Sequence, residues 1–208
     1  MPIVWYLADL KSGAVLDELP LTAGTLERTV GAKTTAEATL DVHDKACPAN
    51  WAELIDPRRA MIVPVDDGLP LGGYVITAAK VGGPSVPFTL TSLEHIPDRT
   101  YCRTLSASEG VDDESDVAAA LLNSRVVPGW GFDLQVTASG KSSDREYDEA
   151  EDRTVFSALA DLMGSRGGPE WITRVHWAND RQSAFAKVIE VGPQIGRRIE
   201  STIFDGHH

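Results

Sequence analysis

The first 21 residues constrain the fold most, because they predict a β-hairpin with almost no chain before it. Apolar and aromatic residues run through IVWYLADL (3–10), and AVLDELPL (14–21) has the composition of a second strand. Between them the turn KSG ends in Gly13, which supplies the flexible backbone that a short hairpin loop needs. No basic and apolar leader typical of a secretory signal precedes this hairpin, so the chain is expected to begin at once as sheet.

Further short strands are expected through the first hundred residues. The segment 34–42 alternates apolar and polar residues with a period of two, which is typical of a half-buried strand. A two-turn helix is predicted in PANWAELIDP, with Asn50 as its N-cap. The other expected strands are 25–30, two strands within 60–81 joined by a turn containing DDG, and one within 87–96. Strands of this length joined by Gly- and Asp-bearing turns favour a compact barrel or sandwich.

The composition changes near residue 105, where a second unit is predicted to begin. SASEGVDDESD (106–116) contains five acidic and no basic residues, which indicates a linker followed by a helix start. We expect one helix over 115–126, packed on a sheet that contains 132–136, and a second within 151–171, ended by Gly164 or Gly167. A final strand pair is expected at 171–178 and 183–192. The predicted fold is α+β and mainly β: a tube-like β-barrel or sandwich of residues 1–105, followed by a smaller α+β domain of residues 106–208.

The charge balance restricts the class of partner. The 208 residues include 31 Asp and Glu against 19 Lys and Arg, for a formal net charge of -12. Such a surface repels polyanions, so ordinary nucleic-acid binding is not expected. Acidity could simply favour solubility, or it could line a conduit through which DNA slides without sticking. No apolar run approaches the roughly 20 residues that a membrane-spanning helix needs.

Residues that could carry chemistry are few. His43, His95 and His176 stand outside any HExxH or GxSxG motif, and Cys47 and Cys102 lack zinc-ligand spacing. The two cysteines are expected to be reduced, partly buried thiols rather than a disulfide. Neither a catalytic residue, nor a metal, nor a cofactor is therefore predicted.

Two clusters leave alternatives open. Six carboxylates could form a glycosidase pair or a calcium site, but the calcium-loop glycine is missing and a solvated loop is favoured. Basic and aromatic residues come together near the end of the chain and could bind a glycan or nucleic acid, although strand aromatics usually belong to the core. The glycines of GWGF (129–132) and GSRGG (164–168) are expected to serve turns. The carboxylates are Asp144, Glu146, Asp148, Glu149, Glu151 and Asp152, and the second cluster is Arg174, His176, Trp177 and Arg181.

The order of these elements resembles the N-terminal part of the minor tail proteins of long-tailed, siphovirus-like actinobacteriophages, a family of tail-tip, baseplate-hub and tail-associated proteins. The similarity covers most of the chain. It is carried by YLADLKSGAVLDELPL, by TTAEATLDV followed by WAELIDPRRAMIVPVDDG, by GGYVITAAK, by EYDEAEDRTVFSALADLMGSRGGPEWITRVHW and, more weakly, by VGPQIGRRI.

This resemblance implies a structural role in the virion tail tip after synthesis in the host cytoplasm. Family members form a ring, usually of three copies, that continues the tail tube for passage of the tape measure protein and DNA. The implied partners are further copies of the chain, the distal tail protein, the tape measure protein and other minor tail proteins. Family chains run well past residue 208, so any receptor-binding or wall-degrading module would lie outside this sequence.

The resemblance also implies roles for individual residues. Trp51, Tyr74 and Trp171 are expected to anchor the core, and Asp and Glu side chains are expected to line a central pore. The opening hairpin would be the first ribbon of a tube-forming barrel. The alternative function is a carbohydrate-binding or cell-wall-degrading tail module, suggested by the acidic cluster at 144–152.

Overall fold

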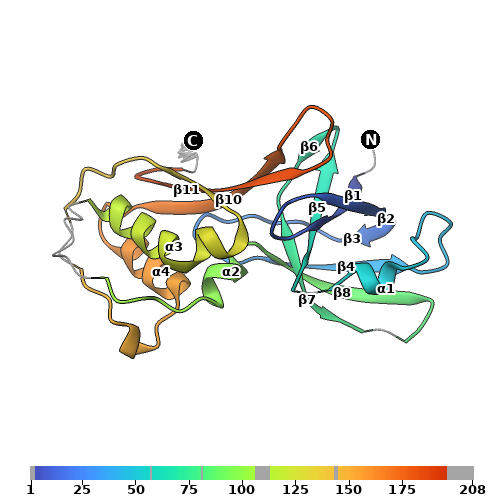
Figure 1. Cartoon of the computed structure of the whole chain (residues 1–208), viewed down its shortest axis with the longest axis horizontal. Helices are drawn as coiled ribbons and strands as arrows, with labels where there is room; N and C mark the ends of the chain where they lie inside the picture. The colour runs from blue at the N-terminus through green and yellow to red at the C-terminus, as the bar shows by residue number, and fades with distance from the viewer. Residues whose placement is uncertain (1–2, 57, 81, 106–112, 143–144, 196–208) are drawn as a thin grey trace, which may run out of the picture.

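A large antiparallel sheet and a smaller three-stranded sheet organise the chain (Figure 1). The computed structural model describes residues 3–56, 58–80, 82–105, 113–142 and 145–195. The large sheet contains β1 (Val4–Asp9), β2 (Val15–Leu19), β3 (Leu21–Ala23), β4 (Thr35–Asp41), β5 (Ala60–Asp66), β6 (Leu69–Pro70), β7 (Tyr74–Ala79) and β8 (Ser85–Ser92). The mainly β, α+β class expected from the sequence is confirmed.

The two edges of the large sheet are joined by a single residue. Its strand order is β2-β1-β5-β7-β8-β4-β3, with β6 added beside β5. β2 and β3 therefore lie at opposite ends of the order, although only Pro20 separates them in the chain. Proline lacks the N–H that a continuing ladder requires, so the ribbon changes partner there from β1 to β4. The sheet must therefore curl strongly. Among the described residues β2 and β3 do not pair, so the sheet is not closed into a barrel. Of the two predicted forms, barrel and sandwich, the structure is sandwich-like.

The inside of this curl is the first of two apolar cores. The alternation predicted for 34–42 is confirmed, since Ala36, Ala38 and Leu40 are buried while the residues between them are exposed. Burying this face removes a continuous apolar surface from water, which is the main force that folds the sheet. The inner core is formed by Trp5, Leu7, Leu19, Leu21, Ala38, Leu40, Ile55, Ala60, Ile62, Tyr74, Ile76, Val86, Phe88 and Leu90.

β5 is buried on both faces, which explains its unbroken apolar sequence. Ile62 belongs to the inner core, whereas Met61 and Val63 belong to a second core on the outer face. Successive strand residues point to opposite faces, so a strand covered on both sides carries no alternation. The second core also contains Leu121 of a helix and Trp171 of the small sheet, so it joins the two halves of the chain. The division into domains at residue 105 remains a prediction.

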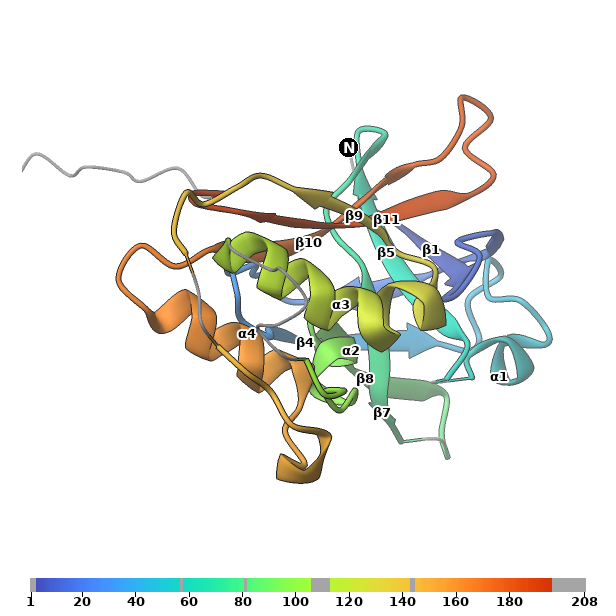
Figure 2. The ribbon, with the colours of Figure 1, turned by 60° about the vertical axis from the view of Figure 1, so that its left-hand side comes forward.

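The second half places helices against the small sheet, as Figure 2 shows. The sheet has the order β10 (Glu170–Trp177), β11 (Phe185–Gly192), β9 (Asp133–Val136), with β11 and β9 parallel. α3 (Glu114–Trp130) and α4 (Val155–Gly164) pack against this sheet and each other, and the short α2 (His95–Asp98) lies beside them. α3 is longer than the 115–126 expected, because Pro128 falls in its last turn and a left-handed Gly131 ends it.

Two local predictions are wrong. Residues 25–30 form no strand, because after Gly24 the backbone leaves β4 and turns toward β10, where the N–H of Gly31 donates to the carbonyl of Trp171. α1 (Trp51–Leu54) has four residues and is shorter than the two turns expected, and the side chain of Asn50 before it does not cap it. The backbone angles of Asn50, φ -101° and ψ 22°, lie outside the extended region that presents a side-chain oxygen to the first turn.

The three proposed anchors differ in burial. Tyr74 and Trp171 are 1% exposed, as expected, whereas Trp51 is only partly buried against the inner core. The predicted linker at 106–112, Asp144 and residues 196–199 of VGPQIGRRI lie outside the described residues. In the described part of the chain no helix is both long and apolar enough to cross a membrane.

Candidate functional site

The acidic cluster forms an exposed loop, as the solvated-loop interpretation predicted. All of its described members are exposed, and Glu149 and Glu151 lie in the short 3-10 helix η2 (Glu149–Glu151). Asp148 caps this turn by accepting the N–H of Ala150 at 3.0 Å, and Glu149 pairs with Arg125 at 2.7 Å. Within the described residues no group of three His, Cys, Asp or Glu side chains is placed to hold a metal ion.

Two members of the basic-aromatic cluster, Trp177 and Arg174, make contacts within the fold. Trp177 stacks on Phe185 with ring centroids 4.1 Å apart and donates its indole N–H to the carbonyl of Gly68. Arg174 pairs with Glu190 at 2.7 Å, and His176 beside it is exposed. The packing interpretation of Trp177 is therefore confirmed.

The other two histidines lie apart from this cluster. His43 is an exposed loop residue whose backbone N–H donates to the carboxylate of Asp41. Burial lowers the pKa of His95 on α2, and the neighbouring Arg99 lowers it further.

Both cysteines are free thiols, Cys102 buried and Cys47 half-buried. Burial raises the pKa of each, which disfavours the reactive thiolate. At Cys47 three carboxylates raise the pKa further: Asp44, Asp41 and Asp17. These charge interactions show that acidic residues from two segments, β2 and the end of β4 with its following turn, gather at this end of the curled sheet.

The tip of the opening hairpin is locked between two elements of the second half. Gly13 has φ 74°, and its carbonyl accepts the N–H of Phe185 on β11 at 2.8 Å. A Cβ atom at Gly13 would overlap the carbonyl oxygen of Phe185, and one at Gly131 would overlap that of Lys11. Only glycine fits both positions, so β11 and the end of α3 fix the tip of the hairpin.

A buried lysine completes this joint. Lys187 on β11 is 2% exposed, and its Nζ donates to the carbonyl oxygens of Leu10 at 2.5 Å and Lys11 at 3.1 Å. Burial lowers the pKa of Lys187 to about 8, against the opposing fields of Asp9 and Asp133. The ring of Phe132 lies 5.6 Å from Nζ. Sequence reasoning missed Lys187, although a lone lysine within the apolar run AFAKVIEV was the available signal.

A second buried tie joins the curled sheet to β10. Glu94 is 2% exposed and accepts hydrogen bonds from the N–H and the hydroxyl of Thr173, at 3.0 and 2.7 Å. Arg28 lies 3.9 Å from the same carboxylate and donates to the carbonyl of Thr173. This contact explains why the chain around residue 28 leaves the large sheet.

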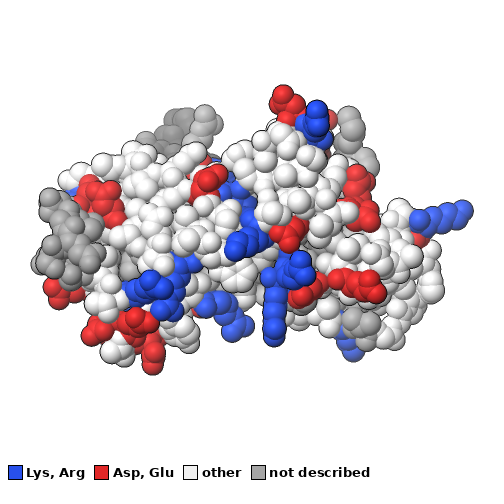
Figure 3. Space-filling model, viewed as in Figure 1, with Lys and Arg blue, Asp and Glu red and all other residues white. Residues whose placement is uncertain are grey.

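A groove with a basic rim lies between the hairpin tip, the start of β5, α2 and the end of α3. We call it the basic groove and define its rim as Lys11, Arg58, Arg59 and Arg99. Two adjoining hollows of about 250 and 620 Å³ form it and share Leu10, Arg58 and Trp130. Figure 3 shows Lys and Arg side chains gathered in the middle of this face, between the helical part and the curled sheet. Apolar residues form the floor: Leu10, Val75, Ile76, Ile96 and Trp130.

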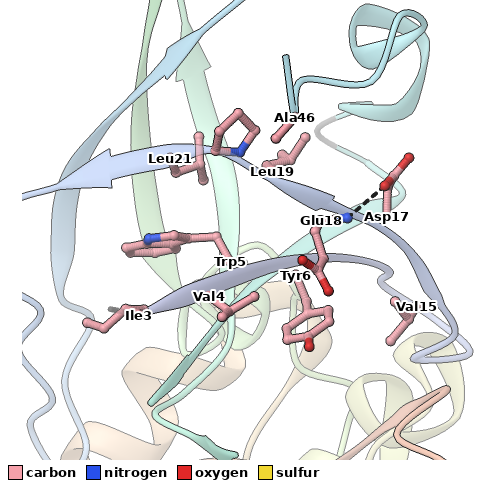
Figure 4. A pocket seen from close by; sticks show the side chains of 11 residues that line it. Ile3, Val4, Trp5, Tyr6, Val15, Asp17, Glu18, Leu19, Leu21 and Ala46 are labelled. Carbon is pink, nitrogen blue, oxygen red and sulfur yellow. Dashed lines mark hydrogen bonds between the residues drawn. The ribbon is translucent and has the colours of Figure 1, made fainter. Parts of the chain in front are cut away.

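A separate hollow of about 610 Å³ lies along β1 and β2 of the opening hairpin, away from the basic groove. Figure 4 shows apolar side chains such as Val4 and Leu19 toward one end of it and Asp17 and Glu18 toward the other. β2 is an edge strand, and its residue Leu16 is 45% exposed. We call residues 16–18 (Leu16, Asp17 and Glu18) the acidic edge. An exposed strand edge with an apolar residue is a typical site for pairing with another chain.

No protein-family model matches this chain, and no curated protein matches it. Among solved structures, the chain is similar to the 43 kDa tail protein of prophage MuSo2 from Shewanella oneidensis. The two share 10% identity at a TM-score of 0.40, over 90% of this chain and 47% of that one. It is also similar to the tail protein from Neisseria meningitidis MC58, with 13% identity and a TM-score of 0.46, over 89% of this chain and 50% of that one. The chain thus spans about half the length of either protein.

Proposed function

We propose that this chain is a structural protein of a phage tail and forms the hub ring at the tail tip. In this role several copies, three in the simplest arrangement, continue the channel of the tail tube. The observation that carries the proposal is the opening hairpin, which leads directly into a curled sheet built from several of the segments on which the resemblance to the tail-tip family rests.

The architecture suits a wall that must be rigid. Gly13, Lys187 and Glu94 tie the curled sheet to the second half through buried contacts. Buried hydrogen bonds with charged partners restrict the sheet to one orientation, since breaking them leaves polar groups without water. A ring wall needs such fixed subunits if its channel is to keep a constant width.

The charge suits a channel for DNA. Each Lys or Arg that neutralises a phosphate adds affinity, so a conduit that releases DNA must avoid such contacts. The net charge of -12 provides this repulsion. We propose that Asp and Glu side chains line the pore of the assembled ring. A density map of the tail tip with a lumen lined mainly by Lys and Arg would contradict this.

The proposed partners are further copies of this chain, the distal tail protein, the tape measure protein and other minor tail proteins. The proposed location is the virion tail tip, after synthesis in the host cytoplasm. The proposal assigns no catalytic residue and no cofactor.

Gene deletion followed by negative-stain imaging tests the structural role. Phage that lack the gene should carry truncated or unfinished tail tips, and the wild-type gene supplied on a plasmid should restore them. Normal, infectious tails in its absence would refute the proposal.

Incubation with host cell-wall material tests the enzymatic alternative. The purified chain should neither release nor retain glycan. Release of glycan would contradict a purely structural role, and retention would favour a carbohydrate-binding module.

A further inference from the structure

We propose that the basic groove of one copy binds the acidic edge of a second copy of this chain. This inference rests on the proposed function, because a ring requires a contact between copies, and it names the two surfaces that meet.

The cations on the rim of the basic groove take part in none of the ion pairs between described residues, although Arg99 donates to Nε2 of His95 at 3.5 Å. Six ion pairs join described residues, and they involve Arg28, Lys33, Arg125, Lys141, Arg153 and Arg174. None of these pairs, within the described part of the chain, includes Lys11, Arg58, Arg59 or Arg99. The carboxylate in the lining is Asp9, whose Oδ1 accepts from Ser12 and the N–H of Lys11 and whose charge is stabilised by Arg59 of the rim.

The chemistry of the basic groove selects an occupant that is both acidic and apolar. Its floor contains Leu10, Ile96 and the partly buried Trp130, so burial of an apolar side chain there would be favourable. Arg58 and Arg59 on the rim are exposed, and guanidinium groups bind carboxylates through paired hydrogen bonds. A nucleic acid would supply anions but no aliphatic group, and the net charge of the chain repels it.

The acidic edge has this combination. Leu16 is 45% exposed and is followed by the exposed Asp17 and Glu18. The negative charge of both residues is felt by their neighbours. Asp17 is one of the carboxylates that raise the pKa of Cys47, and Glu18 adds to the effect of burial in raising the pKa of Tyr6. β2 pairs with β1 on one side, and no strand pairs with its residues 16–18 on the other within the described chain. Residues 16–18 therefore present an unpaired strand edge, on which Asp17 Oδ1 accepts the N–H of Glu18 at 2.8 Å and the Glu18 side chain hydrogen-bonds Tyr6.

The two surfaces differ, so the contact is heterologous. Such a contact leaves a free groove on one copy and a free edge on the other, and it repeats until the rotation closes a ring. Copies that repel each other through their net charge would be aligned by this local attraction, because complementary patches fix the orientation of an encounter.

Charge reversal tests the contact in the full-length chain, with association measured by sedimentation velocity. R58E/R59E and D17K/E18K should each weaken self-association at least about tenfold, since close charge pairs across interfaces are strongly coupled. The quadruple variant should restore association to nearly the wild-type level. Added salt should weaken the wild-type contact, because both partners lie at the surface.

K80E/R166E provides the matched control. It changes the net charge by the same amount as R58E/R59E, at two exposed cations outside the lining of the groove. It should leave association close to that of the wild type, and circular dichroism should show that all variants are folded.

Three outcomes would overturn the inference: a monomeric wild-type chain, reversals without effect, or a quadruple variant that stays dissociated. If the chain self-associates equally well in all the charge-reversal variants, the ring proposal stands but its contact between copies lies on another surface. The gene-deletion experiment tests the tail role independently of this contact.

Discussion

The ammonium group of Lys187 donates a hydrogen bond of 2.5 Å to the carbonyl oxygen of Leu10, which lies 177 residues away in the sequence. The bond joins the last strand of the small sheet to the end of the first strand of the large one. Lys187 is 2% exposed, and a hydrogen bond in such a buried, low-dielectric environment is stronger than one in water. The opening hairpin is thus held in place by a contact with the final hairpin of the described chain.

Removing the amine of Lys187 should lower the stability of the folded chain and change how that stability depends on pH. K187M leaves the carbonyls of Leu10 and Lys11 without their donor and should lower the free energy of unfolding by about 1–3 kcal/mol at pH 7. The control K80M, at an exposed lysine, should change it by less than about 0.5 kcal/mol.

The pH dependence follows from the pKa of Lys187, which is about 8 in the folded chain against an ordinary 10.5. Between about pH 8 and 10.5 the unfolded chain keeps a proton on Lys187 that the folded chain has lost. The contribution of Lys187 to the free energy of unfolding therefore increases as the pH rises through this range. The difference in unfolding free energy between wild type and K187M should grow across this window in urea titrations. Parallel curves would refute the assignment.

Substitution of Gly13 should cost more than its backbone angle alone explains. G13A introduces a Cβ that overlaps the carbonyl of Phe185, whereas Gly167 has the same φ of 74° with nothing within 4 Å. Both variants place an alanine in the left-handed backbone region, which costs a similar strain energy in each, but G13A should be less stable than G167A by about 1–3 kcal/mol. Equal unfolding midpoints would mean that the hairpin tip is not held against β11.

The tie between Glu94 and Thr173 should appear as a coupling energy. T173V removes a hydroxyl that donates to a buried carboxylate at 2.7 Å, and should cost about 1.5–3 kcal/mol. In an E94Q background the same substitution should cost clearly less, as a double-mutant cycle would measure. T89V, which removes the surface bond to Glu37, is the control and should cost less than about 0.5 kcal/mol.

The start of α3 should weaken in acid. Partial burial opposes ionisation of Asp113, but hydrogen bonds from Ser139, Ser115 and Gly140 outweigh it and lower its pKa from 3.8 to about 2. The stabilisation is present above pH 3.8 and is lost as the pH falls toward 2. An NMR titration should find this pKa, and D113N should lose most stability near neutral pH. D116N, at an exposed residue of the first turn, serves as the control.

The elements themselves could largely be predicted from local pattern. The alternation of 34–42 and the helical spacing around Val155 each report which side of a segment is buried, and that information is present in a few neighbouring residues. α3 runs past residue 126 because the apolar pattern of 117–126 does not mark its end, which lies at the left-handed Gly131 after a last turn that contains Pro128.

The candidate surfaces could not be predicted in the same way. The basic groove combines Lys11, Arg58 and Arg99 from three separate segments, and no spacing in the sequence relates them. Lys187 could be noticed as an unusual residue in an apolar strand, but its acceptors lie at the opposite end of the chain.

The sequence by itself determined the mainly β class, the opening hairpin, the net charge and most strand positions, because these depend on neighbouring residues. Only the tertiary structure decided that Pro20 divides one ribbon between β1 and β4, and that residues 25–30 turn to β10 rather than extend the sheet. Those choices depend on which distant backbone groups and apolar faces become available. They are settled by burial of the whole chain, where Lys187 and Glu94 find their partners in the opposite half.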